Sequence, residues 1–198
     1  MSEASNIGKD VINALKEGET ILYPTDTIWG VGCDATNASA VEKLYQIKQR
    51  DREKSMLILM SMALAKKVLP AESCCWKFLL NGNPTTVIFA KEMGTAEVLM
   101  QHRLICPSLL SRDGSIGIRI PQHNILQQWL SAFGKPLVST SANLSGEPSP
   151  KNYEDISPRL KERVDYCVPN LEMFASHRTA GSRILKLVAE DEEPIVIR

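Results

Sequence analysis

Apolar residues recur along the chain at two different spacings. Ile7, Val11 and Leu15 lie four positions apart, which is the spacing of one buried face of a helix. Residues 85–89 instead form a short β-branched and aromatic run, which is typical of a strand. The two patterns together predict strands at 20–23, 56–60, 85–89, 115–120, 136–138, 164–168, 183–188 and 195–197, and helices near 7–15, 39–47, 63–69, 74–80, 125–133 and 153–164. Strands that alternate with helices predict an α/β fold around a mixed, largely buried sheet.

The remaining sequence signals concern boundaries. No linker, repeat or low-complexity segment interrupts the pattern, so we expect residues 1–198 to form a single domain. Ser39 is followed three positions later by Glu42, which predicts a capping box at the start of the second helix. Residues 91–112 carry no clear pattern, and a mobile lid over a binding cavity is one interpretation of them.

A stretch rich in hydroxyl groups, residues 139–150 (STSANLSGEPSP), directly follows the apolar run 136–138. Its hydroxyls, together with Gly146 and Pro148, predict that the strand ends here and that a loop begins. Ligands of open α/β sheets bind at the carboxyl ends of strands, where hydroxyl and backbone N–H groups can hold phosphate or carboxylate oxygens. The alternative interpretation is a solvated loop whose serines cap the next helix.

A basic segment, residues 48–54, is the second polar feature. Its four cations stand at alternate positions: Lys48, Arg50, Arg52 and Lys54. If the helix ends near Lys48 and the chain continues extended, the period of two places these side chains on one face, where they can bind a polyanion. The interleaved Asp51 and Glu53 favour the alternative of a solvated turn with local ion pairs.

A polar elbow, residues 25–32, forms the third feature. It follows the end of a predicted strand, and its Gly30 and Gly32 allow close approach of another group to the backbone. Residues 30–35 also match the dinucleotide-binding pattern G-x-G-x-x-A. The match is weak, because the residues between Pro24 and Gly30 make the strand-to-helix turn longer than that pattern requires.

Composition excludes several classes of function. Lys and Arg number 23, as do Asp and Glu, so the chain has no overall cationic field and any RNA contact needs a local patch. Five cysteines without a Cys-x-x-Cys pair indicate neither a disulfide framework nor a zinc site. The sequence has no signal-peptide pattern and no apolar run near the ~20 residues of a membrane span. These features predict a protein of the reducing cytosol without membrane contact.

Motifs of other enzyme classes are absent from the sequence. It contains no phosphate-binding G-x-x-x-x-G-K-[ST], no H-E-x-x-H and no G-x-S-x-G, and its three histidines are scattered. The remaining inventory is an anion-binding cleft made of hydroxyls, backbone groups, Arg and Lys. Such a cleft suits nucleotide chemistry, because attack on phosphorus needs positioning and charge stabilisation rather than a protein nucleophile.

Four segments resemble motifs of the YrdC/TsaC family of L-threonylcarbamoyladenylate synthases, and they occur in the family's order. They are residues 20–34, 48–50 with Lys54, 117–121 and 135–150. The resemblance spans about residues 8–198. It implies a YrdC-like twisted open mixed β-sheet with flanking helices and a large concave cavity. It also implies that L-threonine, bicarbonate or CO2, and ATP react to threonylcarbamoyl-AMP and pyrophosphate, for N6-threonylcarbamoyladenosine modification of tRNA next to the anticodon.

The same resemblance implies partners and a site. The enzyme would be a cytoplasmic nucleotidyltransferase. It would use Mg2+ with ATP and would have no metal-ligating residues of its own. It would pass its product to a tRNA threonylcarbamoyl transferase complex, and a weak direct contact with tRNA is a further possibility that the resemblance leaves open. Carried over by position, the ATP contacts are Lys48, Arg50, Lys54, Ser115, Ser141, Asn143, Ser149 and Arg198, with Lys48 and Arg50 as catalytic residues. The threonine contacts are Thr27, Arg119, Ser139 and Ser182, where Arg119 offers a two-pronged partner for the carboxylate.

The sequence departs from the family pattern at several positions. Asp51 and Ser55 stand where proline is usual, Asn83 replaces a glycine, Leu59 stands where some members have histidine, and Arg183 replaces a threonine beside Ser182. The threonine half is therefore less well supported than the nucleotide half. Two alternatives stay open: a non-catalytic member that binds tRNA or double-stranded RNA, and a divergent paralogue that acts on another carbamate.

Overall fold

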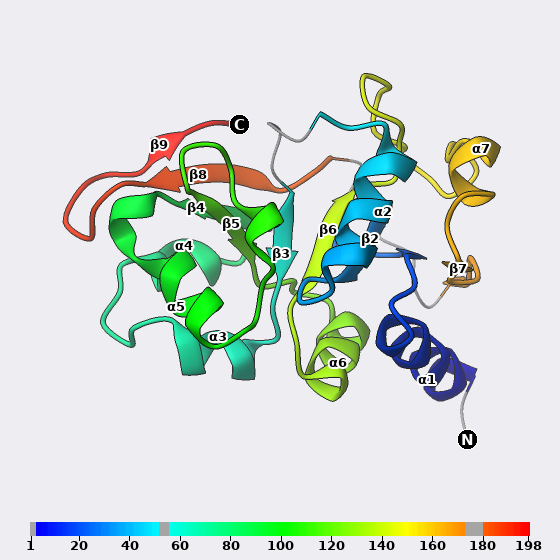
Figure 1. Ribbon diagram of the computed structural model, residues 1–198, viewed down its shortest axis with the longest axis horizontal. Coiled ribbons are helices and arrows are strands. Elements are labelled where there is room, and N and C mark those ends of the chain that lie inside the picture. Colours follow the sequence, from blue (N-terminus) through cyan, green and yellow to red (C-terminus); the bar gives the residue numbers. More distant parts are fainter. Residues whose placement is uncertain (1–2, 52–55, 173–179) are drawn as a thin grey trace.

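The computed structural model describes residues 3–51, 56–172 and 180–198. Its described strands form a sheet in the order β7-β1-β2-β6-β3-β5-β4-β8-β9, which runs across the molecule in Figure 1 from β7 on the right to β9 on the left. The strands are β1 (Ile21–Tyr23), β2 (Gly30–Asp34), β3 (Leu57–Leu59), β4 (Thr85–Phe89), β5 (Ile116–Arg119), β6 (Leu137–Ser141), β7 (Tyr166–Cys167), β8 (Arg183–Leu187) and β9 (Ile195–Val196).

The sheet is mixed and open. The pairs β1–β7, β3–β5 and β4–β8 are parallel, and the other neighbouring pairs are antiparallel. Because β7 and β9 are the two ends of the strand order, the sheet does not close into a barrel. This architecture confirms the predicted α/β class and the open, mixed sheet with flanking helices.

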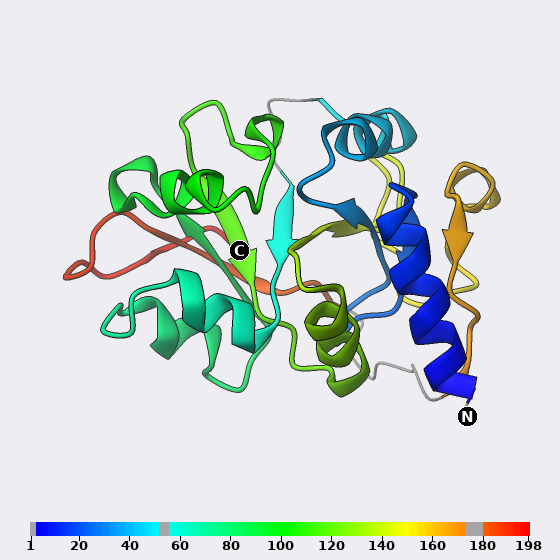
Figure 2. The same cartoon turned by 60° about the horizontal axis from the view of Figure 1, so that its bottom comes forward.

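Helices flank the sheet along its length (Figure 1). They are α1 (Glu3–Lys16), α2 (Ala38–Lys48), α3 (Met62–Val68), α4 (Cys75–Leu79), α5 (Thr95–Gln101), α6 (Asn124–Phe133) and α7 (Pro158–Lys161), with the 3-10 turns η1 (Lys91–Met93) and η2 (Pro107–Leu109). Figure 2 shows α1 and α6 packed side by side. Their close approach depends on Gly8, since a Cβ there would lie 2.8 Å from Nε1 of Trp129. No described helix has the length and apolar character of a bilayer span.

The start of α2 corrects one expectation. Asn37, rather than Ser39, is the N-cap, and its side chain accepts a hydrogen bond from the backbone N–H of Ala40. The helix therefore begins slightly earlier than the predicted capping box. It ends at Lys48, where Gln49 adopts a left-handed conformation with φ of 49°. The helix stop that the basic segment required is thus present.

Two strands differ from the sequence prediction. Residues 30–32, assigned to the elbow, belong to β2, and residues 139–141, assigned to a loop, extend β6. The hydroxyl-bearing residues remain in strand because all three pair with β2, and Ser139 also pairs with Leu57 of β3. Such pairing satisfies the backbone groups of a strand whatever its side chains are.

Two further segments also differ. Between 153 and 164 only the short α7 is helical, because Pro158 starts the helix and the preceding residues form turns. Residues 91–112 fold into two 3-10 turns and α5, with Leu99 and Leu109 fully buried in the core. None of these residues lines the pocket described below. They therefore pack as part of the core, and the interpretation as a lid is not supported.

Gly32 is a position where only glycine fits. A Cβ there would lie 2.0 Å from the carbonyl oxygen of Val138. We expect Gly32→Ala to lower the free energy of unfolding by about 3 kcal/mol, because the β2–β6 pair must separate locally. Gly82→Ala is a suitable control in urea unfolding, since Gly82 has a φ of 80° and open space around it. The control should cost only about 1–2 kcal/mol, and an equal loss in both variants would contradict the steric explanation.

Candidate active site

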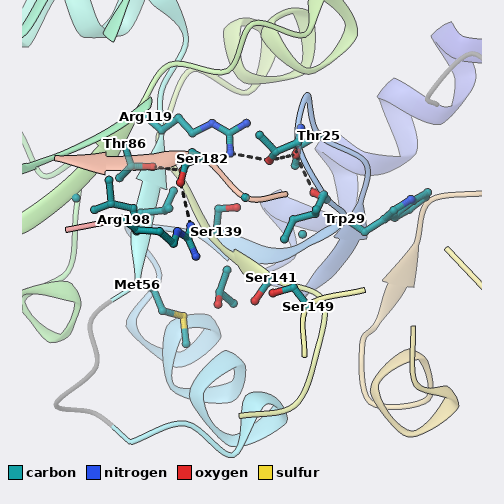
Figure 3. Close-up of a pocket in the computed structure, with 18 of the residues that line it drawn as sticks. Thr25, Trp29, Met56, Thr86, Arg119, Ser139, Ser141, Ser149, Ser182 and Arg198 are labelled. Atoms are coloured by element: carbon teal, nitrogen blue, oxygen red, sulfur yellow. Dashed lines mark hydrogen bonds between the residues drawn. The ribbon is translucent and has the colours of Figure 1, made fainter. Parts of the chain in front are cut away.

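An open pocket with a cavity volume of about 230 Å³ is lined by residues of the neighbouring strands β2, β6, β3, β5, β4 and β8 and of adjoining loops. Eight predicted site residues line it: Thr27, Arg50, Arg119, Ser139, Ser141, Ser149, Ser182 and Arg198. In Figure 3, Arg119 lies at one end and Ser141 and Ser149 lie at the opposite end. The structure thus brings Arg50 of the basic segment and three serines or threonines of β6 together around one hollow, as the sequence predicted for Arg50 and Ser141.

Arg119 organises the end of the pocket assigned to threonine. It ends β5, is 5% exposed, and donates from Nη1 to Oγ1 of Thr27 at 3.0 Å. Thr27 is held in turn by Thr25, whose Oγ1 lies 2.9 Å from that of Thr27 and accepts its backbone N–H at 3.0 Å. Nη2 of Arg119 forms a short ion pair with Asp26. The guanidinium is therefore fixed by two neighbouring residues of the elbow.

Asp26 is the residue at this end that sequence reasoning missed. It was counted only as part of the elbow, yet its second carboxylate oxygen also accepts the backbone N–H of Gln122 at 3.0 Å. Asp26 thereby connects the elbow to the segment after β5. The available signal was its place between Thr25 and Thr27, and nothing local in the sequence pairs it with Arg119.

Ser182 and Arg198 form another wall of the pocket. The hydroxyls of Ser182 and Thr86 lie 2.7 Å apart, and Nη2 of Arg198 donates to the carbonyl oxygen of Ser182 at 3.0 Å (Figure 3). The backbone carbonyl of Arg198 accepts the N–H of Ile184 at 2.9 Å, which ties this residue to β8. Arg183, one of the departures from the family pattern, is exposed and lies outside the pocket lining.

Lys48 occupies a different place from the one expected. Its side chain is buried, with 1% of the residue exposed, and it does not line the pocket. The ammonium donates to the carbonyl oxygens of Ser141, at 2.5 Å, and of Asn143, and it reaches Oδ1 of Asn143 at 3.3 Å. In the other direction, the backbone N–H of Ser145 donates to the carbonyl oxygen of Lys48 at 2.9 Å. Lys48 therefore clamps the end of α2 to the end of β6.

Burial lowers the pKa of Lys48 to about 7; Arg50 acts in the same direction, and Glu147 opposes it. In the unfolded chain the pKa is near its ordinary value of 10.5. Between these values the unfolded state binds more protons than the folded state, so stability rises with pH. We expect the free energy of unfolding of the wild type, relative to Lys48→Met, to be constant below pH 7 and to rise from pH 7 toward 10.5. Urea unfolding of both proteins across this pH range measures the difference between their free energies of unfolding. A difference that stays constant or falls above pH 7 would contradict the prediction.

The other predicted nucleotide contacts do not belong to the described lining of the pocket. Asn143 lies beside the pocket and outside its lining, with Oδ1 accepting the hydroxyl of Ser141 at 2.5 Å. Ser115 also lies outside the lining, and its hydroxyl donates to Asp113 at 2.6 Å and lies 3.1 Å from the hydroxyl oxygen of Ser111. Lys54, together with Arg52 and Ser55, falls outside the described residues. The role of these residues in binding ATP stays a prediction.

The apolar part of the lining was not singled out in the sequence. Met56, Leu57 and Ile184 supply it, and Trp29 adds an aromatic ring whose centroid lies 4.8 Å from that of Tyr153. Met56 and Leu57 lie at the start of β3, so the strand prediction contained them without marking them as site residues. A pocket with apolar walls, three arginines and several hydroxyls can bind a ligand that carries both a flat ring and anionic groups.

Metal-binding groups are scarce in the part of the chain that the structure describes. No cluster of three His, Cys, Asp or Glu side chains occurs there. Among the described pocket-lining residues the side-chain oxygen donors are hydroxyls, from residues such as Ser141 and Ser149. Hydroxyls can complete the coordination of a Mg2+ that arrives on a nucleotide, since Mg2+ usually keeps several waters and binds substrate phosphates.

Solved structures resemble this fold closely. The crystal structure of P. abyssi Sua5 complexed with L-threonine matches with a TM-score of 0.78 at 20% identity; the match covers 100% of this chain and 55% of the other. The E. coli YciO structure matches with a TM-score of 0.75 at 23% identity, covering 100% of this chain and 90% of the other. At these identities the likeness concerns the fold.

Sequence relatives are closer. Threonylcarbamoyl-AMP synthase of Vibrio parahaemolyticus is 34% identical over 157 residues, covering 79% of this chain and 82% of the relative. The protein of the same name from Photobacterium profundum is 35% identical over 159 residues with the same coverage. The Sua5/YciO/YrdC family, described as "Telomere recombination", matches residues 13–198. The chain therefore belongs to the Sua5/YciO/YrdC family.

Proposed function

We propose that this protein is an L-threonylcarbamoyladenylate synthase, which makes threonylcarbamoyl-AMP and pyrophosphate from L-threonine, bicarbonate or CO2, and ATP. One observation carries the proposal: Arg50, Arg119 and Arg198 line the same pocket as the hydroxyls of β6. Each reactant is an anion or carries anionic groups, and cations with oriented donors are the groups that such ligands need. Relatives that share about a third of the sequence bear the corresponding name.

Threonine is proposed to bind at the Arg119 end of the pocket. Arg119 donates to Thr27 from Nη1 and pairs with Asp26 through Nη2, and it lines the pocket. Its guanidinium gives this end of the pocket a fixed positive charge and planar geometry, which suit a carboxylate. The hydroxyls of Ser139 and Ser182 line the same pocket and supply further donors.

ATP is proposed to bind at the opposite end, with Arg50, Ser141 and Ser149 around its phosphates, and with Arg198 contacting it from the wall that Arg198 shares with Ser182. The neutral amine of threonine adds to CO2 through a new N–C bond and loses a proton to water, which gives a carbamate. A carbamate oxygen then attacks the α-phosphorus, and the bond from this phosphorus to the oxygen that bridges it to the β-phosphorus breaks, so that pyrophosphate leaves. The cations offset the charge that develops on the phosphate oxygens, while the pocket holds the reacting groups in contact.

Mg2+ is proposed to enter with ATP as part of the substrate. Bound to the phosphates, the ion would supply positive charge that offsets the charge developing on the leaving pyrophosphate. The hydroxyl-rich lining suits this arrangement, because it can contribute neutral oxygen ligands without a dedicated carboxylate site. Removal of Mg2+ by a chelator is expected to abolish pyrophosphate release.

The product defines the next partner. Threonylcarbamoyl-AMP is a reactive mixed anhydride, so we propose that a tRNA threonylcarbamoyl transferase complex receives it. The balanced net charge of the chain offers little general attraction for tRNA, and direct RNA contact is therefore a secondary proposal that depends on the basic segment. The cytoplasm is the compartment proposed for this reaction.

Pyrophosphate release tests the proposed function directly. The purified protein with ATP and Mg2+ should release pyrophosphate only when threonine and bicarbonate are both present. Release that requires a different amino acid would favour the divergent paralogue. Absence of release, together with RNA binding that weakens steeply with salt and ignores threonine, would favour the non-catalytic RNA-binding alternative.

A further inference from the structure

The tyrosine at the end of β1 reaches across a whole strand of the sheet. Tyr23 is fully buried, and its hydroxyl donates to Oγ of Ser139 at 2.6 Å. Tyr23 lies on β1 and Ser139 on β6, and β2 stands between these two strands in the sheet. A hydrogen bond of this kind requires that the aromatic ring pass over the face of β2.

Two glycines of β2 make room for that ring. A Cβ at Gly30 would lie 3.3 Å from Cζ of Tyr23 and 3.4 Å from its hydroxyl oxygen, and a Cβ at Gly32 would lie 3.1 Å from Cε1. The glycines are two positions apart and so share one face of the strand. Pairing in register places Tyr23 opposite Gly30, and Gly32 opposite Ser139. The two glycines of the elbow therefore form a groove for the Tyr23 ring.

The direction of this hydrogen bond decides what Ser139 can do. A phenol is more acidic than an aliphatic hydroxyl and is the better donor of the two. Burial raises the pKa of Tyr23 well above its ordinary range, so the phenol keeps its proton. With Oγ of Ser139 accepting from Tyr23, the serine's own hydrogen must point elsewhere. Ser139 lines the pocket, and the pocket is the direction that remains.

We infer that Tyr23 is a positioning residue that holds the Ser139 hydroxyl as a hydrogen-bond donor facing the substrate. The inference rests on the proposed function, because it concerns the threonine end of that site. A fixed donor favours an accepting oxygen, such as a carboxylate or the carbamate formed from threonine. It disfavours an ammonium group at the same point, since two donors would then face each other.

Tyr23→Phe removes the donor and keeps the ring in its groove. We expect the dissociation constant and KM for threonine to rise about five- to tenfold, the size of one neutral hydrogen bond, because the Ser139 hydroxyl is free to rotate. KM for ATP should change less than about twofold, since the nucleotide lies at the other end of the pocket. Tyr166→Phe, the same change on β7 outside the pocket lining, is the matched control and should leave both values unchanged.

A double-mutant cycle separates positioning from packing. If Tyr23 acts through Ser139, Tyr23→Phe should have no further effect on threonine affinity in a Ser139→Ala background. A loss of similar size in both backgrounds would overturn the inference. 3-Fluorotyrosine at position 23 keeps the donor and should retain wild-type affinity within about twofold, so it also tests the idea if Tyr23→Phe does not fold.

The outcomes distinguish this inference from the proposed function. Wild-type protein that binds no threonine would overturn both. Wild-type protein that binds threonine, with Tyr23→Phe binding it equally well, would overturn the positioning role of Tyr23 alone. Calorimetric titration with L-threonine measures the affinity of the wild type and of Tyr23→Phe. The unfolding midpoint of each protein shows whether the variant is folded.

Discussion

Replacement of Arg119 by glutamine is expected to weaken threonine binding by about 100-fold or more, because the variant loses the charged partner of the carboxylate. The same change leaves Asp26, whose side chain is 10% exposed, without its ion-pair partner. We therefore also expect the free energy of unfolding to fall by about 2–3 kcal/mol. Calorimetry with threonine and urea unfolding measure the two effects separately.

The double variant Asp26→Asn, Arg119→Gln is the control for this prediction. It replaces both charges with neutral groups of similar shape, so it should recover most of the lost stability. It should not recover threonine binding. Recovery of binding together with stability would show that Arg119 is needed only for folding, and the assignment of a carboxylate partner would then be wrong.

The second large effect is expected at Lys48. Lys48→Met keeps a long apolar side chain and removes the three hydrogen bonds to Ser141 and Asn143. The buried carbonyl oxygens lose their donor, which costs about 2–4 kcal/mol of stability. Because the end of β6 then loses its clamp, the affinity for ATP should fall by about tenfold or more.

Arg50→Ala is the matched comparison for Lys48→Met. Arg50 lines the pocket, so its removal should weaken ATP binding by a similar factor. Its effect on the unfolding midpoint should be much smaller, since the clamp between α2 and β6 stays in place. If Lys48→Met weakened ATP binding without destabilising the fold, Lys48 would contact the nucleotide directly, and the clamp would not be its main role.

The different effects expected for the Arg119, Lys48 and Arg50 variants follow from the contacts of each side chain. The sequence predicts only some of these contacts. The helical face of α6 and the β-branched run of β4 were predictable, because their spacing depends on neighbours in the chain. The basic segment and the hydroxyl-rich stretch were also predicted to meet. The resemblance to family motifs identified eight of the residues that line the pocket, including its three arginines.

Other features could not be predicted because they depend on distant contacts. The sequence predicts an elbow at residues 30–32 of β2 and a loop at residues 139–141 of β6. Both segments are strands because β2 and β6 pair with each other, more than 100 positions apart in the chain. The sequence predicts Lys48 as one of four cations that share a face and bind a polyanion, whereas its burial follows from carbonyl groups more than 90 positions away. The sequence alone contains no signal for such an acceptor.

The sequence by itself determined the alternation of helices and strands, the chemical groups available for an anion site, and the family. Local periodicity and short motifs carry that information, since both depend on residues near one another in the chain. The tertiary structure alone decided which groups face the pocket and which hold them in place. Arg119 pairs with Asp26, and Tyr23 with Ser139, over more than 90 positions of the chain, so the geometry of both pairs exists only once the sheet has assembled.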